Sequence, residues 1–202
     1  MANPKVFIPF YSRSGTVEGL AKAIAEGAQS QGAEVRLRRA RELVGHDILS
    51  SVPGWKEDAD RMNALYAAPT PEDAQWADAI ILGSPTRFGV LASELKAYID
   101  GLGGLWANGA LNGKVGSAFT GSATPHGGNE STFVSLYNPL MHFGMVLVPP
   151  GYADGVMFAG AGSPYGATVV SGNPPAGPSE AELAVARFQG ARVAQFARKL
   201  LG

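Results

Sequence analysis

The chain has 202 residues, a formal net charge of −1, 46% hydrophobic residues and no cysteine. This length fits one domain, and the lack of cysteine excludes disulfides, thiolate metal sites and cysteine nucleophiles. A nearly neutral chain without a long apolar segment predicts a cytoplasmic protein, with no nucleic acid and no membrane among its partners.

Residues 5–28 predict a strand, a hydroxyl-rich turn and an amphipathic helix. Residues 5–11 are almost continuously apolar, as in a buried strand, although Pro9 lacks the N–H that a central strand donates. The turn Ser12–Thr16 offers hydroxyl groups, Gly15 and a helix N-terminus, which together suit a phosphate. The alternative is an ordinary strand-to-helix turn with Thr16 as the N-cap.

Further elements follow in the first half of the chain. Residues 33–39 alternate between apolar and polar, which predicts a half-covered strand near a sheet edge. Residues 42–70 have weak periodicity and predict a long surface excursion with at most one short helix. A short helical turn at 71–76 and a second buried strand at 78–83 come next.

Strands and helices continue to alternate in the second half. The predicted elements are a helix over 91–102, a Gly-rich loop at 103–109, a strand at 114–120, a Pro139-kinked helix over 130–143, a strand at 145–148, an insertion at 149–178, and a final helix that starts after the capping box at Ser179 and buries Leu200. This alternation predicts a three-layer α/β domain with a parallel sheet of five strands.

Three loops that leave the carboxyl ends of predicted strands are rich in small and hydroxyl residues. They are residues 12–16, 84–89 and 120–128. Ligands of parallel α/β sheets bind at this edge. The first loop suits a phosphate, and the other two suit a flat ring that Phe88 and Trp106 wall by stacking.

Other site classes lack their motifs. The sequence contains no G-x-G-x-x-G after the first strand, no G-x-x-x-x-G-K-[ST] and no G-x-S-x-G. Its three histidines lie far apart with no further ligand at metal-binding spacing. Dinucleotide-binding Rossmann sites, nucleoside triphosphate hydrolysis, serine hydrolases and metal sites are therefore disfavoured.

These motifs resemble the WrbA-type NAD(P)H:quinone oxidoreductases, which are flavodoxin-like FMN proteins. The resemblance covers the whole chain and is carried by Tyr11-Ser12 through Gly15, residues 25–28, Gly83-Ser84-Pro85-Thr86-Arg87-Phe88-Gly89, residues 103–106, 109–111, 126–128, His142, Gly144-Met145 and residues 163–167. It implies a flavodoxin-like sheet in the order 2-1-3-4-5. The domain then spans 1–202, with insertions near 43–76 and 149–178.

The resemblance also implies the site. FMN would be bound by Ser12, Arg13, Ser14, Gly15, Thr16, Val17, Pro85, Thr86, Arg87, Phe88, Gly89, Gly121, Ser122, Ala123, Thr124, Gly127 and His142, the last from a neighbouring subunit or loop. Trp106 would line the pocket for quinone and nicotinamide. The implied partners are NADH or NADPH, a quinone and three further copies in a homotetramer. Relatives often carry an aromatic residue where this chain has Ser14.

Four of these residues also have a simpler interpretation. Arg87 suits either a surface ion pair or the edge of the flavin, and Arg13 either a phosphate or solvent. His142 suits a helix cap as well as a flavin contact, and Trp106 an interface as well as a substrate pocket.

The resemblance implies FMN-dependent transfer of two electrons from NADH or NADPH to a quinone. With one nucleotide-sized cradle and two flat substrates that need the same flavin face, we expect ping-pong kinetics. The alternative is a one-electron carrier that docks on protein partners. Such carriers tend to be strongly acidic around the flavin, and a net charge of −1 speaks against this alternative.

Overall fold

A parallel β-sheet forms the middle layer of the computed structural model, which describes residues 3–159 and 162–202. Its strands lie in the order β2-β1-β3-β5-β6, which confirms the predicted flavodoxin-like order. Their bounds are β1 (Lys5–Phe10), β2 (Glu34–Arg39), β3 (Ala79–Arg87), β5 (Val115–Ser122) and β6 (Val146–Leu147). A short antiparallel strand, β4 (Val90–Leu91), folds back on the end of β3.

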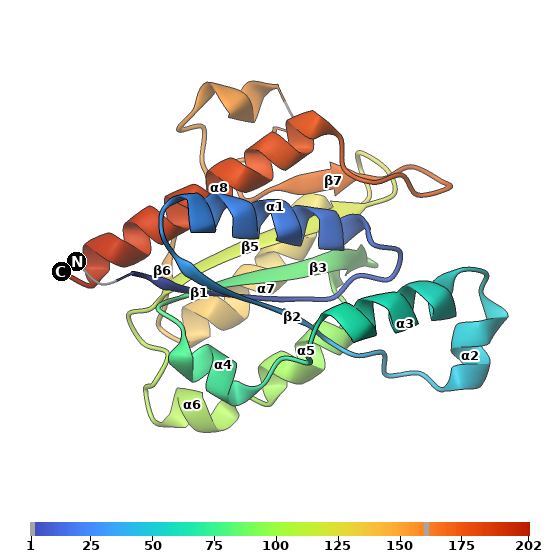
Figure 1. The fold of residues 1–202 in the computed structure, drawn as a ribbon, viewed down its shortest axis with the longest axis horizontal. Helices are drawn as coiled ribbons and strands as arrows, with labels where there is room; N and C mark the ends of the chain where they lie inside the picture. The colour runs from blue at the N-terminus through green and yellow to red at the C-terminus, as the bar shows by residue number, and fades with distance from the viewer. Residues whose placement is uncertain (1–2, 160–161) are drawn as a thin grey trace.

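Helices cover both faces of the sheet, as right-handed crossovers require (Figure 1). One face carries α1 (Thr16–Ser30) and α8 (Glu180–Leu200), and the other carries α4 (Pro71–Trp76), α5 (Ser93–Asp100) and α7 (Asn129–His142). Each face buries its own apolar cluster. In α8 the predicted capping box at Ser179 is confirmed, whereas Leu200 is exposed and its predicted burial is wrong.

Two glycines let α1 and α8 pack with their backbones in contact. A Cβ on Gly27 would lie 1.9 Å from the carbonyl oxygen of Arg187, and a Cβ on Gly190 would lie 1.9 Å from that of Ile24. No larger residue fits at either place, so this crossing fixes α1 against the sheet. The predicted phosphate loop, residues 12–16 at the start of α1, therefore has a rigid support.

Pro9 lies in β1 although this strand has neighbours on both sides. The N–H of Tyr11 donates to Gly83 of β3, so the missing N–H of Pro9, two residues earlier, falls on the same side. Pairing between β1 and β3 accordingly skips Ile8 and Pro9 and resumes at Phe10. The strand tolerates proline because the interruption affects one neighbour only.

The predicted surface excursion at residues 42–70 contains more helix than the sequence predicts. It forms two helices, α2 (His46–Ser51) and α3 (Trp55–Leu65), instead of at most one. Both extend beyond the carboxyl edge of the sheet, on the right in Figure 1. Residues 103–109 are likewise not a plain loop, because α6 (Gly103–Ala107) forms there.

The fifth strand of the sheet is divided in two. β6 pairs with Val115 and Gly116 at the start of β5, and β7 (Thr168–Val170) pairs with Thr120, Gly121 and Ser122 at its end. The described residues between them include a short 3-10 helix, η1 (Gly155–Phe158). The predicted insertion at 149–178 thus also supplies a strand, which the sequence analysis missed. None of the helices in the described residues is long and apolar enough to cross a membrane.

Candidate functional site

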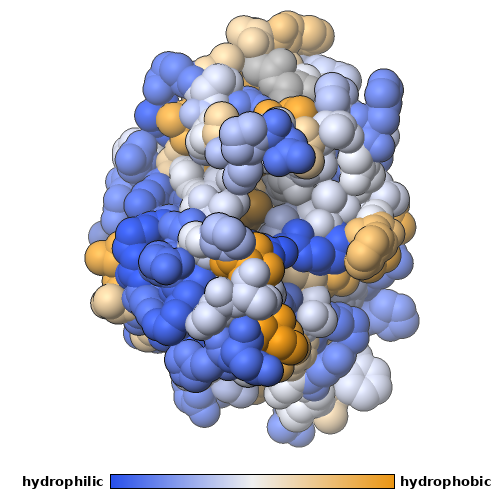
Figure 2. All heavy atoms as spheres, turned by 90° about the vertical axis from the view of Figure 1, so that its right-hand side faces the viewer, coloured by the Kyte–Doolittle hydropathy of each residue, from blue (hydrophilic) through white to orange (hydrophobic). Residues whose placement is uncertain are grey.

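A cavity of about 660 Å³ opens at the carboxyl edge of the sheet. Figure 2 shows this edge face on, with hydrophilic residues beside pale areas and smaller hydrophobic patches. The cavity joins the predicted phosphate loop, residues 12–16, to the ends of β3 and β5. Of the predicted residues, it is lined by Ser12, Arg13, Ser14, Thr16, Val17, Pro85, Thr86, Arg87, Gly121, Ser122 and Ala123.

The phosphate loop presents the start of α1 to the cavity. Gly15 is the N-cap, with φ 81°, and Thr16 is the first helical residue, so the N-cap expected at Thr16 is one position off. Only glycine adopts this left-handed conformation without strain. No side chain in the described part of the chain caps the helix, while the hydroxyls of Ser14 and Thr16 lie 3.3 Å apart beside it. Backbone N–H groups without a side-chain cap, next to two hydroxyls, suit an anion, as predicted for this loop.

A fully buried arginine, Arg39, binds the backbone of this loop. Arg39, at the end of β2, donates from Nη2 to the carbonyl oxygen of Ser12 at 2.9 Å. Its charge is paired with the carboxylate of Glu42, and its Nη1 donates to Asn63 of α3 at 2.6 Å. Alternation along β2 places Arg39 on the same face as Val35 and Leu37, but it gives no signal for the partners of the buried charge. The loop backbone is therefore fixed by a buried charge.

Glu18, in the first turn of α1, joins the loop to α3. Burial alone would raise the pKa of Glu18, but hydrogen bonds from Arg61, Lys22 and Tyr66 outweigh it and lower this pKa to about 2. Arg61 binds both carboxylate oxygens, at 3.2 and 2.8 Å. Its guanidinium also reaches the loop, since a Cβ on Gly15 would lie 3.2 Å from Arg61 Nη2. The sequence gives no signal for the pairing of Glu18 with Arg61, because these residues lie 43 positions apart.

Neutral hydrogen bonds hold the other end of the cavity. Thr120 donates to the carbonyl oxygen of Ser84 at 2.7 Å, and the hydroxyl of Ser84 accepts from the N–H of Ala92 at 2.8 Å. Ser122 donates to the carbonyl oxygen of Thr124 at 2.7 Å. A Cβ on Gly127 would lie 2.7 Å from that of Ser122, so this tight turn requires glycine. These bonds place backbone groups of two strand ends around one space.

Several predicted residues belong to these loops without lining the cavity. They are Gly15, Phe88, Gly89, Thr124 and Gly127. Phe88 is fully exposed at the tip of the β3–β4 hairpin, and its φ of 53° is unusual for a non-glycine residue. Among the described residues, the exposed ring of Phe88 has no contact that would explain this conformation.

Trp106 and His142 lie at the other end of the domain. The indole N–H of Trp106 in α6 donates to the carbonyl oxygen of His142 at 3.1 Å. His142 ends α7, whose 14 residues span roughly 21 Å from the N-cap at Gly128. Within one chain, these two residues are therefore not brought together with the cavity.

Two walls of the cavity come from the segments that the sequence analysis treated as insertions. One is formed by Val52, Pro53, Gly54, Trp55 and Asp58, and the other by Ser171, Gly172, Asn173 and Pro175. The second wall is tied to the end of β5, because the N–H of Ser171 donates to the carbonyl oxygen of Ser122 and the N–H of Gly172 to that of Ala123. The length of both segments was the one available signal for a role at the site.

The family model described as NADPH-dependent FMN reductase matches residues 11–156. A protein of Deinococcus radiodurans named NAD(P)H dehydrogenase (quinone) is 43% identical over 98% of each chain. One of the same name from Rhodopseudomonas palustris is 44% identical over 98% of this chain and 99% of its own.

Solved structures give the same result for the fold. A flavodoxin, WrbA-like protein from Agrobacterium tumefaciens has a TM-score of 0.68 at 25% identity, covering 98% of this chain and 99% of its own. An archaeal flavodoxin has a TM-score of 0.62 at 17% identity over 96% and 99% of the two chains. The chain therefore belongs to the NADPH-dependent FMN reductase family and, within it, to the WrbA-like NAD(P)H dehydrogenases (quinone).

Proposed function

We propose that this protein is an FMN-dependent enzyme that transfers two electrons from NADH or NADPH to a quinone. The observation that carries this proposal is that one cavity is lined both by the loop at the start of α1, which suits an anion, and by the ends of β3 and β5. The names of the relatives at 43% and 44% identity specify the same reaction. A cytoplasmic location stays a prediction.

The residues at the loop fit the phosphate of FMN. Uncapped N–H groups of α1, the hydroxyls of Ser14 and Thr16, and the left-handed Gly15 form a cradle that a Cβ on Gly15 would narrow. Because α1 has 15 residues, its dipole adds favourably to the binding of a phosphate dianion. When bound, FMN supplies the redox chemistry by accepting a hydride from NAD(P)H and giving two electrons to the quinone.

The residues at the other end would orient the ring and balance its charge. Thr86 and Arg87 end β3, while Gly121 and Ser122 end β5 and Ala123 follows it, so backbone groups from two strands face the same space. The guanidinium of Arg87 is anchored to the carbonyl oxygen of Thr86 at 3.0 Å. A cation held there would favour negative charge on the reduced ring system.

Nicotinamide and quinone would occupy the same open side of the cavity in turn. Adding NADH to the FMN-loaded protein without oxygen should bleach the flavin absorbance, and benzoquinone should restore it with continuous turnover. Bleaching without quinone turnover would contradict the proposal and favour the one-electron carrier instead.

We extend the proposal to a homotetramer in which neighbouring chains complete the cavity with Trp106 and His142. Both residues lie far from the cavity of their own chain, and Phe88 is fully exposed beside it. An apolar groove of about 480 Å³ also runs along α7, where Val134 and Met141 are exposed. Patches of this kind commonly mark protein interfaces. Sedimentation of an FMN-loaded monomer at micromolar concentration would contradict this assembly.

A further inference from the structure

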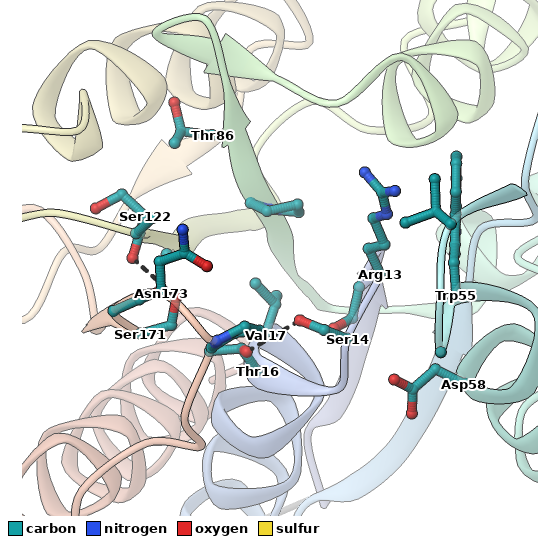
Figure 3. A pocket seen from close by; sticks show the side chains of 18 of the residues that line it. Arg13, Ser14, Thr16, Val17, Trp55, Asp58, Thr86, Ser122, Ser171 and Asn173 are labelled. Carbon is teal, nitrogen blue, oxygen red and sulfur yellow. Dashed lines mark hydrogen bonds between the residues drawn. The ribbon is translucent and has the colours of Figure 1, made fainter.

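The cavity continues past the phosphate loop to an end that the flavin site does not need. Val52, Trp55 and Asp58 line this end together with Arg13 and Ser14. In Figure 3, Arg13 and Trp55 lie on one side of Ser14, whereas Thr86 and Ser122 lie on the other. A ligand with its ring at Thr86 and its phosphate on the loop would leave the Trp55 end open.

Arg13 and Trp55 form a flat, charged surface there. The guanidinium carbon of Arg13 lies 3.8 Å from the centre of the Trp55 ring, a stacking distance. Figure 3 shows Arg13 on the cavity side of Trp55. A planar guanidinium that is backed by an indole binds flat aromatic rings by stacking, which a lysine ammonium does not.

The surface has a fixed position because α3 is tied to the phosphate loop. Asn63 of α3 binds the buried Arg39, and Arg61 of α3 binds Glu18 in the first turn of α1 at 2.8 Å. Tyr66, which ends α3, donates to the same carboxylate at 2.8 Å. Trp55, the first residue of this helix, is therefore placed before any ligand arrives, which lowers the entropic cost of binding.

We propose that the adenine ring of NAD(P)H stacks on Arg13, with Trp55 as the positioning residue behind it. This inference rests on the proposed function. The nicotinamide must reach the Thr86 end to react, so the other half of the dinucleotide extends across the exposed Ser14. Beyond Ser14, the guanidinium of Arg13 offers a flat surface on which the adenine ring can stack. A quinone has no second half and makes no use of this surface.

The test compares two hydride donors. Reduced nicotinamide mononucleotide (NMNH) carries the reacting ring of NADH but no adenosine. In the FMN-loaded Trp55→Leu variant, the ratio of KM for NADH to KM for NMNH should rise at least about fivefold, because base stacking has a value of that order. Trp76→Leu is the matched control: Arg36 stacks on Trp76 at 3.9 Å in α4, outside the cavity lining, and its ratio should match wild type.

A second variant separates stacking from simple charge attraction. Arg13→Lys keeps the charge and loses the planar group, so it should raise the KM ratio as Trp55→Leu does. Calorimetry with ADP-ribose gives a readout without turnover, and its affinity for FMN-loaded protein should fall at least about fivefold in both variants.

A wild-type ratio in Trp55→Leu, or a wild-type ratio in Arg13→Lys, would overturn the inference. Failure of the proposed function looks different, because wild-type protein would then reduce quinone with neither donor.

Discussion

The two ends of the cavity are stabilised by different interactions: buried ion pairs at one end and neutral hydrogen bonds at the other. Below the phosphate loop, the buried Arg39 and the carboxylates of Glu42 and Glu18 carry charges. At the ends of β3 and β5, the hydroxyls of Thr120 and Ser84 make neutral hydrogen bonds. Removing one member of a buried ion pair leaves a desolvated charge, whereas losing a neutral bond costs far less. The phosphate end should therefore respond much more strongly to substitution.

Arg39→Met tests this difference where the largest effect is expected. The variant leaves Glu42 buried without its partner and frees the carbonyl oxygen of Ser12, so the free energy of unfolding should fall by about 3–5 kcal/mol. Urea unfolding measures it. The double variant Arg39→Met/Glu42→Met should recover part of the loss, because both charges are gone. A single variant as stable as wild type would show that the buried pair does not support the loop.

Thr16→Glu tests the loop as an anion site. A carboxylate at the start of α1 would face the phosphate, and two charges about 5 Å apart repel by about 3 kcal/mol at the dielectric typical of protein surfaces. FMN affinity, measured by fluorescence titration, should therefore fall about 100-fold. Riboflavin, which has no phosphate, should lose much less, and Thr16→Ser should bind FMN like wild type. Unchanged FMN affinity would show that the phosphate lies elsewhere.

Glu18 makes the free energy of unfolding depend on pH. Its pKa is lowered in the folded state from 4.5 to about 2, so the ionised form stabilises the fold above about pH 4.5. This contribution should be lost as the pH falls from 4.5 towards 2. Unfolding free energies of wild type and Glu18→Gln should thus differ at neutral pH and converge in acid. A constant difference across this range would argue against the ion pair with Arg61.

Thr120→Val should have the smallest effect, because it acts at the neutral end. The change keeps the shape of the side chain and removes one buried hydrogen bond to Ser84, so the free energy of unfolding should fall by about 1–2 kcal/mol. Thermal unfolding measures this loss. A cost as large as that of Arg39→Met would remove the distinction between the two ends.

Local sequence patterns predicted the features that depend on neighbouring residues, such as strands, helices and helix caps. The alternation of strands and helices predicted the sheet, and the small residues of 12–16, 84–89 and 120–128 marked three segments that meet at one cavity, although 84–87 and 120–122 are the ends of β3 and β5 and not loops. The capping box at Ser179 is a signal of the same local kind. These features depend on neighbours within a few residues, which the sequence displays directly.

Contacts between residues far apart in the chain could not be predicted from the sequence. Arg39 lies on the same face of its alternating strand as Val35 and Leu37, yet the burial of its charge depends on Glu42 and on Asn63, 24 positions away. The helices of 46–65 and the strand at Thr168 have too few periodic residues to be recognised alone. Trp106 and His142 lie far from the cavity within one chain, so their proposed role depends on the assembly.

Steady-state kinetics test most directly the central claim that one flavin cavity serves both substrates. NADH should be varied at several fixed concentrations of benzoquinone, below any substrate inhibition. Because nicotinamide and quinone would use the same open side of the cavity in turn, the double-reciprocal lines should be parallel. Intersecting lines would mean that both substrates bind together, which contradicts a single shared site.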